Sequence, residues 1–347
     1  MSSTHQAREL GSVMEAEMGE QPARLAALLA RGPELAERVR KAVPGPLAGT
    51  VLVARGSSDH AATCGAYLLE MATHRPVALA SPSLHTLYKA DTDFSGYMVI
   101  AVSQSGRTPE IVEMAELAGR KGAWTLAFTN DGESPLAKAA QLVVELGAGE
   151  ERAVPATKTV TAELTAFAIV AGALGETGVS EQAAKELPGQ VAAVLDDKAP
   201  AEELAAALVG ADRIATVARG LLYGAAREVA LKLEETTARF TAAFSAADLR
   251  HGPIAMATSG PSIVAFAHPG PAAEDVTSLV SELRARGADA RLAGPVEGSV
   301  LGWDASAPEA LAPVLAVVRG QQLALALARL SGRDPDSPPG LTKVTVT

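Results

Sequence analysis

A short apolar run that ends in a hydroxyl-rich turn is the feature that most constrains how this chain can fold. The run extends from Met98 to Val102, and the segment Ser103-Gln-Ser-Gly-Arg-Thr108 follows it directly. Such a run is typical of a buried strand, and the Pro109-Glu110 pair fits the first turn of a helix. A strand-loop-helix unit brings backbone N–H groups and a helix N-terminus to one point, which favours a phosphate dianion. The sequence therefore predicts a phosphate site with hydroxyl donors from Ser103, Ser105 and Thr108.

The same hydroxyl groups are also compatible with a helix cap that satisfies only the start of the helix. A second unit of the same kind favours the ligand site, because the run Val51 to Ala54 leads into Arg55-Gly-Ser-Ser-Asp-His60. Neither loop closes with a Lys-Ser or Lys-Thr pair, and neither has the G-x-G-x-x-G pattern. These absences exclude a nucleoside triphosphate loop and a dinucleotide fingerprint. We therefore expect the ligand to be a small phosphate ester.

Apolar runs alternate with helical patterns along most of the chain, which predicts an α/β fold with doubly wound, mostly parallel sheets flanked by helices. The alternation occurs twice, as in a degenerate internal repeat, and residues 175–200 are expected to connect the two units. The expected strands are 51–54, 77–80, 98–102, 124–129 and 142–146 in the first unit, and 213–218, 262–267 and 290–293 in the second. Helices are expected near 161–174, 225–237 and 273–286. The expected division is an N-terminal helical segment (1–40), a first domain (41–180), a second domain (200–330) and a C-terminal tail (331–347).

Composition limits the possible partners and compartment. The 347 residues include 48% hydrophobic residues, and the formal net charge is −10. This charge argues against sequence-independent binding to nucleic acid or to an anionic membrane, both of which need clustered Lys and Arg. Cys64 is the only cysteine, so no intrachain disulfide can form, and we expect a cytoplasmic protein with Cys64 as a buried structural residue. Neither a signal peptide nor a membrane-spanning segment is expected.

Three charged residues of the second unit share one helical face. Glu228, Lys232 and Glu235 stand at positions i, i+4 and i+7. A solvated surface ladder has the same spacing. The helix follows the strand end near Val217 to Gly220, however, and an open α/β sheet binds its ligand at such an end. That position favours a catalytic role.

His251 precedes a Gly-Pro turn and is a candidate for proton transfer, because an imidazole titrates near neutral pH. The other histidines share no metal-ligand spacing with cysteine or carboxylate residues, so no metal site is expected.

Four segments, in this order along the chain, resemble the sugar isomerase (SIS) domains of glucosamine-6-phosphate synthase. They are 103–108, Glu151-Arg-Ala-Val-Pro-Ala-Thr-Lys158, the helix and loop from Glu228 to Pro253, and Leu341-Thr-Lys-Val-Thr-Val346. The similarity extends from about Glu20 to the last residue and implies two tandem SIS domains with the tail lying over the active site. The synthases also carry a glutaminase domain with a terminal cysteine nucleophile. Because this sequence begins Met1-Ser2, we expect no such domain, as in stand-alone isomerase-type glucosamine-6-phosphate deaminases.

The resemblance implies a role for each matching residue. Glu235 corresponds to the base that moves a proton between C1 and C2, Lys232 to the neighbouring cation, and His251 to the ring-opening acid-base group. Lys343 corresponds to the lysine that forms a Schiff base with fructose 6-phosphate in the synthase, and Glu228 belongs to the same catalytic group. The substrate-binding positions are Ser58, Ser103, Gln104, Ser105, Thr108, Val154 and Thr157. The sequence departs from the family pattern at Arg107, Ala156 and Thr342.

The expected reaction is deamination and isomerisation of glucosamine 6-phosphate to fructose 6-phosphate and ammonia, without a cofactor. The residue types suit ring opening and C2 proton abstraction. The alternatives with the same site are a galactosamine 6-phosphate deaminase, a fructosamine phosphate deglycase and a dehydratase acting on N-acetylglucosamine 6-phosphate. A non-enzymatic sugar-phosphate sensor is a further alternative, although the N-terminal region has no helix-turn-helix pattern or basic patch. The resemblance also implies a homodimer in which the His251 loop reaches the neighbouring subunit's sugar.

Overall fold

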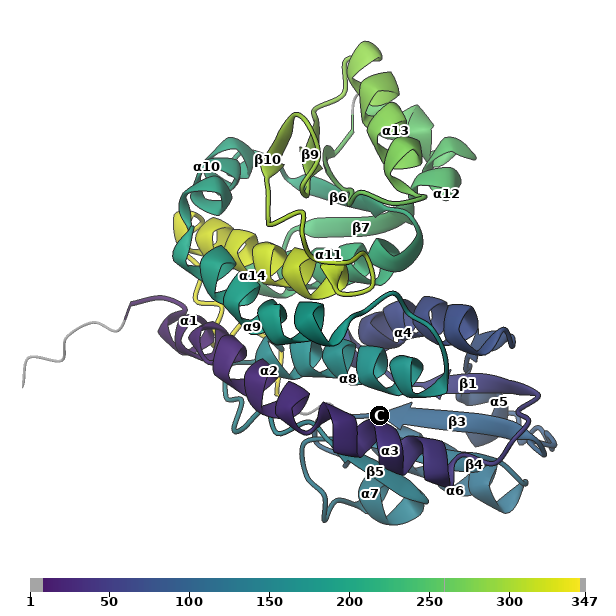
Figure 1. Ribbon diagram of the computed structural model, residues 1–347. Helices are drawn as coiled ribbons and strands as arrows, with labels where there is room; N and C mark the ends of the chain where they lie inside the picture. The colour runs from purple at the N-terminus through teal and green to yellow at the C-terminus, as the bar shows by residue number, and fades with distance from the viewer. Residues whose placement is uncertain (1–8, 259, 344–347) are drawn as a thin grey trace, which may run out of the picture.

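The computed structural model describes residues 9–258 and 260–343 and contains two five-stranded sheets whose paired strands are all parallel (Figure 1). The first sheet has the order β2-β1-β3-β4-β5, and the second has the order β10-β9-β8-β6-β7. The strands of the first sheet are β1 (Gly49–Val53), β2 (Val77–Leu79), β3 (Tyr97–Val102), β4 (Trp124–Thr129) and β5 (Leu142–Glu145). Those of the second sheet are β6 (Arg213–Ala218), β7 (Phe240–Ser245), β8 (Ser262–Phe266), β9 (Ala290–Ala293) and β10 (Ser299–Leu301).

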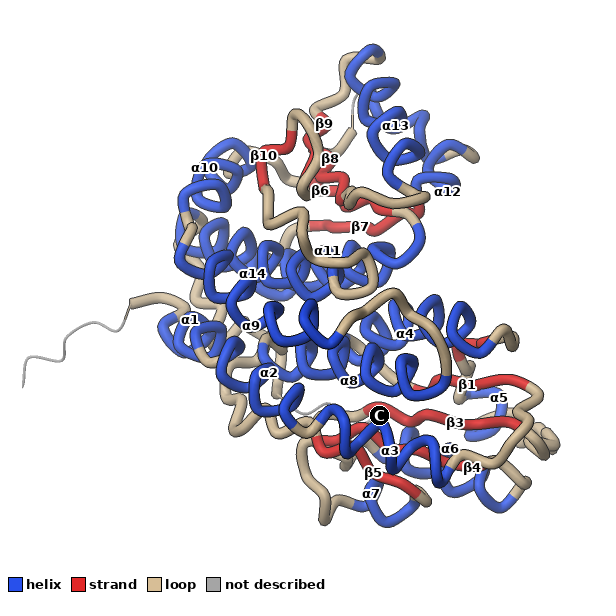
Figure 2. Tube along the Cα trace, viewed as in Figure 1, coloured by secondary structure: helices blue, strands red, loops and turns tan. Residues whose placement is uncertain are grey.

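Helices surround and separate the sheets, as the two groups of strands in Figure 2 show. The α-helices are α1 (Ser12–Gly19), α2 (Gln21–Ala30), α3 (Gly32–Ala42), α4 (Ser57–Thr73), α5 (Ser83–Thr86), α6 (Pro109–Arg120), α7 (Pro135–Ala139), α8 (Lys158–Leu174), α9 (Glu181–Asp196), α10 (Ala199–Leu208), α11 (Tyr223–Thr237), α12 (Ala246–Arg250), α13 (Ala273–Ala285) and α14 (Ala312–Leu330). The 3-10 helices are η1 (Gly220–Leu222) and η2 (Pro253–Thr258). No helix in the described ranges is long and apolar enough to cross a membrane.

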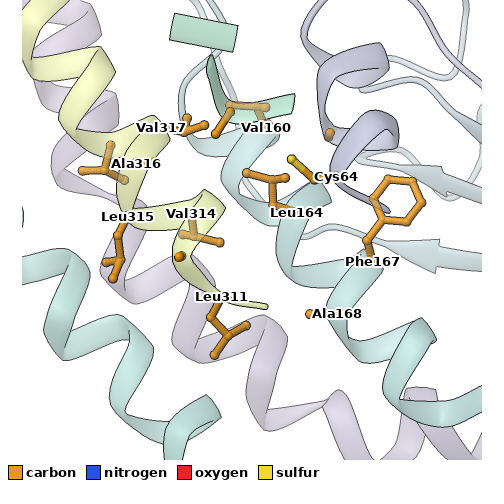
Figure 3. Packing of buried hydrophobic residues seen from close by; sticks show 14 of the residues in the cluster. Cys64, Val160, Leu164, Phe167, Ala168, Leu311, Val314, Leu315, Ala316 and Val317 are labelled. Atoms are coloured by element: carbon orange, nitrogen blue, oxygen red, sulfur yellow. The ribbon is translucent and has the colours of Figure 1, made fainter. Parts of the chain in front are cut away.

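The largest hydrophobic core joins the helices that lie between the two sheets. It includes side chains of α4, α8, α11 and α14 together with the facing sides of both sheets. Figure 3 shows Cys64 of α4, Phe167 of α8 and Val314 of α14 in one part of this core. Burial raises the pKa of the Cys64 thiol to about 12, which agrees with its expected structural role.

Two glycines allow the central helices to approach closely. A Cβ at Gly65 of α4 would lie 2.4 Å from the Phe167 ring of α8, and one at Gly224 of α11 would lie 2.4 Å from the His60 carbonyl of α4. Larger side chains would force the helices apart. Gly65 therefore brings the middle of α4 close to α8, and Gly224 brings the first turn of α4 close to α11.

The structure confirms the predicted α/β class, and every strand expected from the sequence is present within a few residues. Residues 175–200, which were expected to connect the two units, mostly form helix α9, and this helix was not expected. Leu187, Val191 and Val194 form the buried face of α9, and Ser180 caps it by accepting from Ala183 N. Strands β7 and β10 were not expected; both lie at the edges of the second sheet.

Candidate active site

Two loops meet at the carboxyl edge of the first sheet. Strands β1 and β3 are parallel neighbours, so the loops that follow them emerge side by side. The first loop leads into α4 at Ser57, and the second leads into α6 through Thr108. Glu110 in the first turn of α6 binds Arg55 of the first loop, with 2.7 Å between Arg55 Nη2 and Glu110 Oε2. This ion pair connects the two loops at the rim of the site.

The hydroxyl groups of the second loop do not serve as helix caps. Thr108 is the N-cap residue of α6, yet its side chain makes no capping hydrogen bond. Its Oγ1 lies 3.2 Å from Ser103 Oγ, and Ser105 Oγ accepts from Arg107 N at 3.2 Å. The alternative in which these hydroxyls satisfy only the helix start is therefore wrong for Thr108. The side chains line a pocket at a helix N-terminus, which suits an anion.

The pocket has a volume of about 700 Å³ and brings together segments that are far apart in the sequence. Its walls come from the two loops, the segment 151–156, the start of α8, the end of α11 and the tail at 341–343. Of the residues that the sequence assigns to the site, Ser58, Ser103, Gln104, Ser105, Thr108, Val154, Glu235 and Lys343 line it.

The charged face of α11 is buried rather than solvated. The side chains of Glu228 and Lys232 are each 1% exposed, and that of Glu235 is 21% exposed. Lys232 Nζ lies 2.5 Å from Glu235 Oε2 and 3.4 Å from Glu228 Oε1. Glu228 Oε2 also lies 2.8 Å from His60 Nδ1. The surface-ladder alternative is thus excluded, and only Glu235 of this group faces the pocket.

The pKa directions in this group follow from burial and from the shared cation. Burial raises the pKa of Glu235 above its ordinary value, although Lys232 opposes the shift. Burial would lower the pKa of Lys232, but the Glu228 and Glu235 carboxylates outweigh it and raise that pKa. Lys232 is therefore a fixed cation, and Glu235 is a candidate base whose pKa lies above that of an exposed glutamate.

The tail enters the same pocket through an ion pair. Lys343 Nζ lies 2.8 Å from Oε2 of Glu151, whose side chain is fully buried. Glu151 also accepts from Thr157 N at 2.9 Å and from Thr159 Oγ1 at 2.6 Å. Burial would raise the pKa of Glu151, but Lys343 and these hydrogen bonds hold it below its ordinary value. Thr157 is buried behind Glu151 and does not line the pocket, unlike the role that the resemblance implies.

Helix α1 holds the preceding part of the tail. The Asp336 carboxylate accepts from Val13 N at 2.9 Å and from Met14 N at 2.7 Å, and Asp334 accepts from Gly11 N at 3.0 Å. Carboxylates at a helix N-terminus are favourable there. Leu341 is 45% exposed and so does not anchor the tail, and Val344 and Val346 lie outside the described residues. Polar contacts, rather than Leu341, therefore position the described end of the tail.

His251 lies apart from this pocket. It follows α12 in the second sheet's domain, is exposed to solvent and is not among the residues that line the pocket. Within one chain, His251 therefore stands away from Glu235 and Lys343, and its role in ring opening stays a prediction that requires a second subunit. The described residues contain no cluster of three or more His, Cys, Asp or Glu side chains that could hold a metal ion.

Two acidic residues of the site were not identified from the sequence. Glu151 was only part of a matching segment, and its contact with Lys343 joins residues 192 positions apart. Glu163 is an isolated carboxylate on the largely apolar helix α8, and it lines the pocket. The isolated carboxylate could have identified Glu163 as a candidate site residue, because a charged residue within a buried helix needs a partner or a function.

Burial raises the pKa of Glu163 to about 8, with a smaller contribution from the negative charge of Glu151. The folded protein therefore binds a proton that the unfolded chain releases between about pH 4.5 and pH 8. The wild-type protein loses this part of its stability as the pH rises through that range, whereas a glutamine does not titrate. We expect Glu163→Gln to melt at nearly the wild-type temperature at pH 4.5 and several degrees higher at pH 8. Calorimetry at both pH values, with the exposed Glu113→Gln as the control, measures the effect, and a constant difference between the two pH values would contradict it.

Loss of the loop hydroxyls provides a test of the anion site. Hydrogen bonds to charged groups contribute about 1.5–3 kcal/mol each. We expect Ser105→Ala combined with Thr108→Ala to raise KM for a phosphorylated sugar by well over tenfold. Steady-state kinetics measures this change, and an unchanged KM would show that the hydroxyls do not contact the ligand.

The fold and pocket define a double-sheet α/β protein with a candidate ligand pocket, which is lined by a hydroxyl-rich loop at a helix N-terminus and by the Glu235 carboxylate. The chain belongs to the SIS domain family, whose model matches residues 50–172 and 207–293. It is 33% identical over 305 residues to the glutamine–fructose-6-phosphate aminotransferase (isomerizing) of Methanothermobacter thermautotrophicus, a match that covers 85% of this chain and 51% of the relative. The chain thus spans about half the length of the curated relatives it matches.

Solved structures extend the comparison over nearly the whole chain. A proposed phosphosugar isomerase from Silicibacter pomeroyi superposes with a TM-score of 0.83 at 31% identity, covering 93% of this chain and 99% of that one. Glucosamine-6-phosphate deaminase from Thermotoga maritima superposes with a TM-score of 0.80 at 22% identity, covering 97% and 100%. The second similarity is a similarity of fold.

Proposed function

We propose that this protein is a phosphosugar isomerase that deaminates glucosamine 6-phosphate, giving fructose 6-phosphate and ammonia. The observation that supports this proposal is a single pocket that is lined by the phosphate-type loop 103–108, Glu235 and Lys343. The names of the Thermotoga and Silicibacter structures support the same class of substrate.

The residues of the pocket suit each step. The loop hydroxyls and the N-terminus of α6 hold the phosphate, which fixes the sugar carbons relative to Glu235. In the open-chain aldehyde, Glu235 removes the C2 proton and the electron pair forms an enolamine, while the buried Lys232 holds the Glu235 side chain in place. Return of this proton to C1, together with transfer of a proton from the nitrogen to O1, gives a C2 imine. Water then adds to C2 and ammonia leaves, so the ketose is formed without a net redox change.

Ring opening requires an acid-base group. His251 is the candidate for this role, but it does not line the described pocket of its own chain. We propose that His251 of the partner subunit fills this role in a homodimer. The solvent exposure of His251 in the single chain is compatible with this proposal.

A product assay on several substrates tests the function. Purified protein is incubated separately with glucosamine 6-phosphate, galactosamine 6-phosphate, N-acetylglucosamine 6-phosphate and a fructosamine 6-phosphate. Ammonia, ketose phosphate, free amine and an ultraviolet-absorbing unsaturated sugar are followed. We expect equal amounts of ammonia and fructose 6-phosphate from glucosamine 6-phosphate. Unsaturated sugar from the N-acetylated substrate would instead identify a dehydratase, and binding without turnover of any substrate would identify a sensor.

A further inference from the structure

A buried pair of side chains, Ser58 and Glu163, forms part of the pocket wall and has no assigned role as a unit. Ser58 lies in the first turn of α4, and its Oγ donates to Glu163 Oε1 on α8 at 2.8 Å. Glu163 is 1% exposed, and its Oε2 has no hydrogen-bond partner within the described part of the chain. A buried polar atom without a partner is costly in a folded protein. Its place beside a ligand pocket indicates that the bound ligand offsets this cost.

The hydrogen-bond direction determines what kind of ligand group fits. A serine hydroxyl has one hydrogen, and Ser58 uses it to donate to Glu163. The remaining lone pairs of Ser58 Oγ can then only accept a hydrogen bond from the ligand. A ligand donor at this point has a carboxyl group directly behind its acceptor, so a cationic donor gains more than a neutral hydroxyl does.

The surrounding charges leave Glu163 without a cation of its own. Glu151, from the loop before α8, and Glu228, from α11, are the charged groups that act on it, and both are negative. Each is already paired, Glu151 with Lys343 at 2.8 Å and Glu228 with Lys232 at 3.4 Å. Glu163 forms no ion pair within the described residues at 4.0 Å or less.

We propose that Ser58 and Glu163 form the subsite for the amino group of the substrate, with Ser58 Oγ accepting from the C2 ammonium and Glu163 balancing its charge. This inference rests on the proposed function, because it assumes an amino sugar phosphate as the substrate. It assigns to Glu163 the selection of an amino sugar over the corresponding hydroxyl sugar.

The proposal has a consequence for protons. Burial raises the pKa of Glu163 to about 8, so the carboxyl of the empty site carries a proton at pH 7. Placing an ammonium group against Ser58 favours the carboxylate. The combined system of ammonium and carboxylic acid therefore releases one proton to solvent, whichever of the two groups gives it up. A hydroxyl ligand causes no such release.

Two inert ligands isolate this effect. The probes are 2-amino-2-deoxyglucitol 6-phosphate and glucitol 6-phosphate, which differ only in the group at C2 and have no carbonyl to isomerise. Calorimetric titration at pH 7, in two buffers of different ionisation enthalpy, gives the Kd and the number of protons released for each. We expect wild-type protein to bind the amine at least about tenfold more tightly, and to release up to one more proton with it than with the alcohol.

The variant Glu163→Gln keeps the shape of the side chain and removes its ionisation. It is expected to abolish both the preference for the amine and the additional proton release, while its Kd for glucitol 6-phosphate stays within about threefold of the wild-type value. Ser58→Ala is expected to lose the preference as well, and Glu113→Gln on the exposed face of α6 is the matched control.

Equal weakening of both ligands by Glu163→Gln, or an undiminished amine preference, would overturn the proposal and leave Glu163 a structural residue. The result is independent of catalysis, because neither probe reacts. Deamination of glucosamine 6-phosphate by a Glu163→Gln variant with unchanged amine preference would refute only the subsite. An amine preference in a wild-type protein that releases no ammonia would refute only the proposed reaction.

Discussion

Replacing Glu235 with glutamine is expected to lower kcat for glucosamine 6-phosphate by about 10²–10⁴-fold. The amide cannot accept the C2 proton, yet its oxygen can still accept a hydrogen bond from Lys232, which lies 2.5 Å from Glu235 Oε2 in the wild-type protein. Lys232 also keeps its second partner, Glu228. The geometry of the pocket is therefore preserved while the base is lost, and steady-state kinetics with ammonia detection measures the difference.

The neighbouring residue on α11 provides a matched control for this variant. Glu234 is exposed and does not line the pocket, so Glu234→Gln is expected to retain wild-type kcat. The Kd of Glu235→Gln for glucitol 6-phosphate should stay close to the wild-type value, because the phosphate loop is unchanged. Turnover by Glu235→Gln near the wild-type rate would refute the assignment of the base.

The raised pKa of Glu235 adds a pH dependence to the same experiment. The base acts only when it is deprotonated, and burial shifts its deprotonation to a higher pH than that of an exposed glutamate. We expect kcat/KM to rise with pH along an acidic limb whose midpoint lies above 4.5, the ordinary value for glutamate.

The sequence predicts the first sheet and its phosphate-type loop because their signals are local. Each central strand is a continuous apolar run, and the turn 103–108 follows its strand without a gap. The edge strands β7 and β10 were not predicted, because they lack such a local signal. Strand β7 consists of Phe240-Thr-Ala-Ala-Phe-Ser245, in which small and polar residues predominate, and its pairing with β6 determines that it is a strand. Helix α9 was not predicted, because Pro188 and many polar residues obscure its apolar periodicity.

The site contacts that could not be predicted from the sequence join residues that are far apart along the chain. His60 and Glu228 are 168 positions apart, and no local pattern relates them. They meet because Gly224 permits a close approach of α11 to the first turn of α4. The family resemblance predicted Glu235 and Lys343 in one site. The buried carboxylates Glu151 and Glu163 are identified as neighbours of this pair only when the packed structure brings the segments together.

Replacing Lys343 with alanine is expected to reduce turnover of glucosamine 6-phosphate by orders of magnitude. The residue stands in a tail that local patterns would leave solvated, yet its amine lines the pocket and pairs with Glu151. In the alanine variant, the pocket loses the side-chain amine of Lys343, and the buried Glu151 carboxylate loses its cationic partner. Because an unpaired buried charge is destabilising, a lower melting temperature is expected together with the loss of activity.

The variant Lys343→Arg separates the two roles of this residue. Arginine keeps a positive charge that can pair with Glu151, but it stays protonated and cannot act as a nucleophile or exchange a proton. If the amine itself takes part in the reaction, Lys343→Arg will melt near the wild-type temperature and remain as inactive as Lys343→Ala. If the charge alone is needed to dock the tail, arginine will restore activity along with stability. Steady-state kinetics beside melting curves for both variants decides between these outcomes, and full activity of Lys343→Ala would show that the tail is dispensable and weaken the assignment as an amino sugar deaminase.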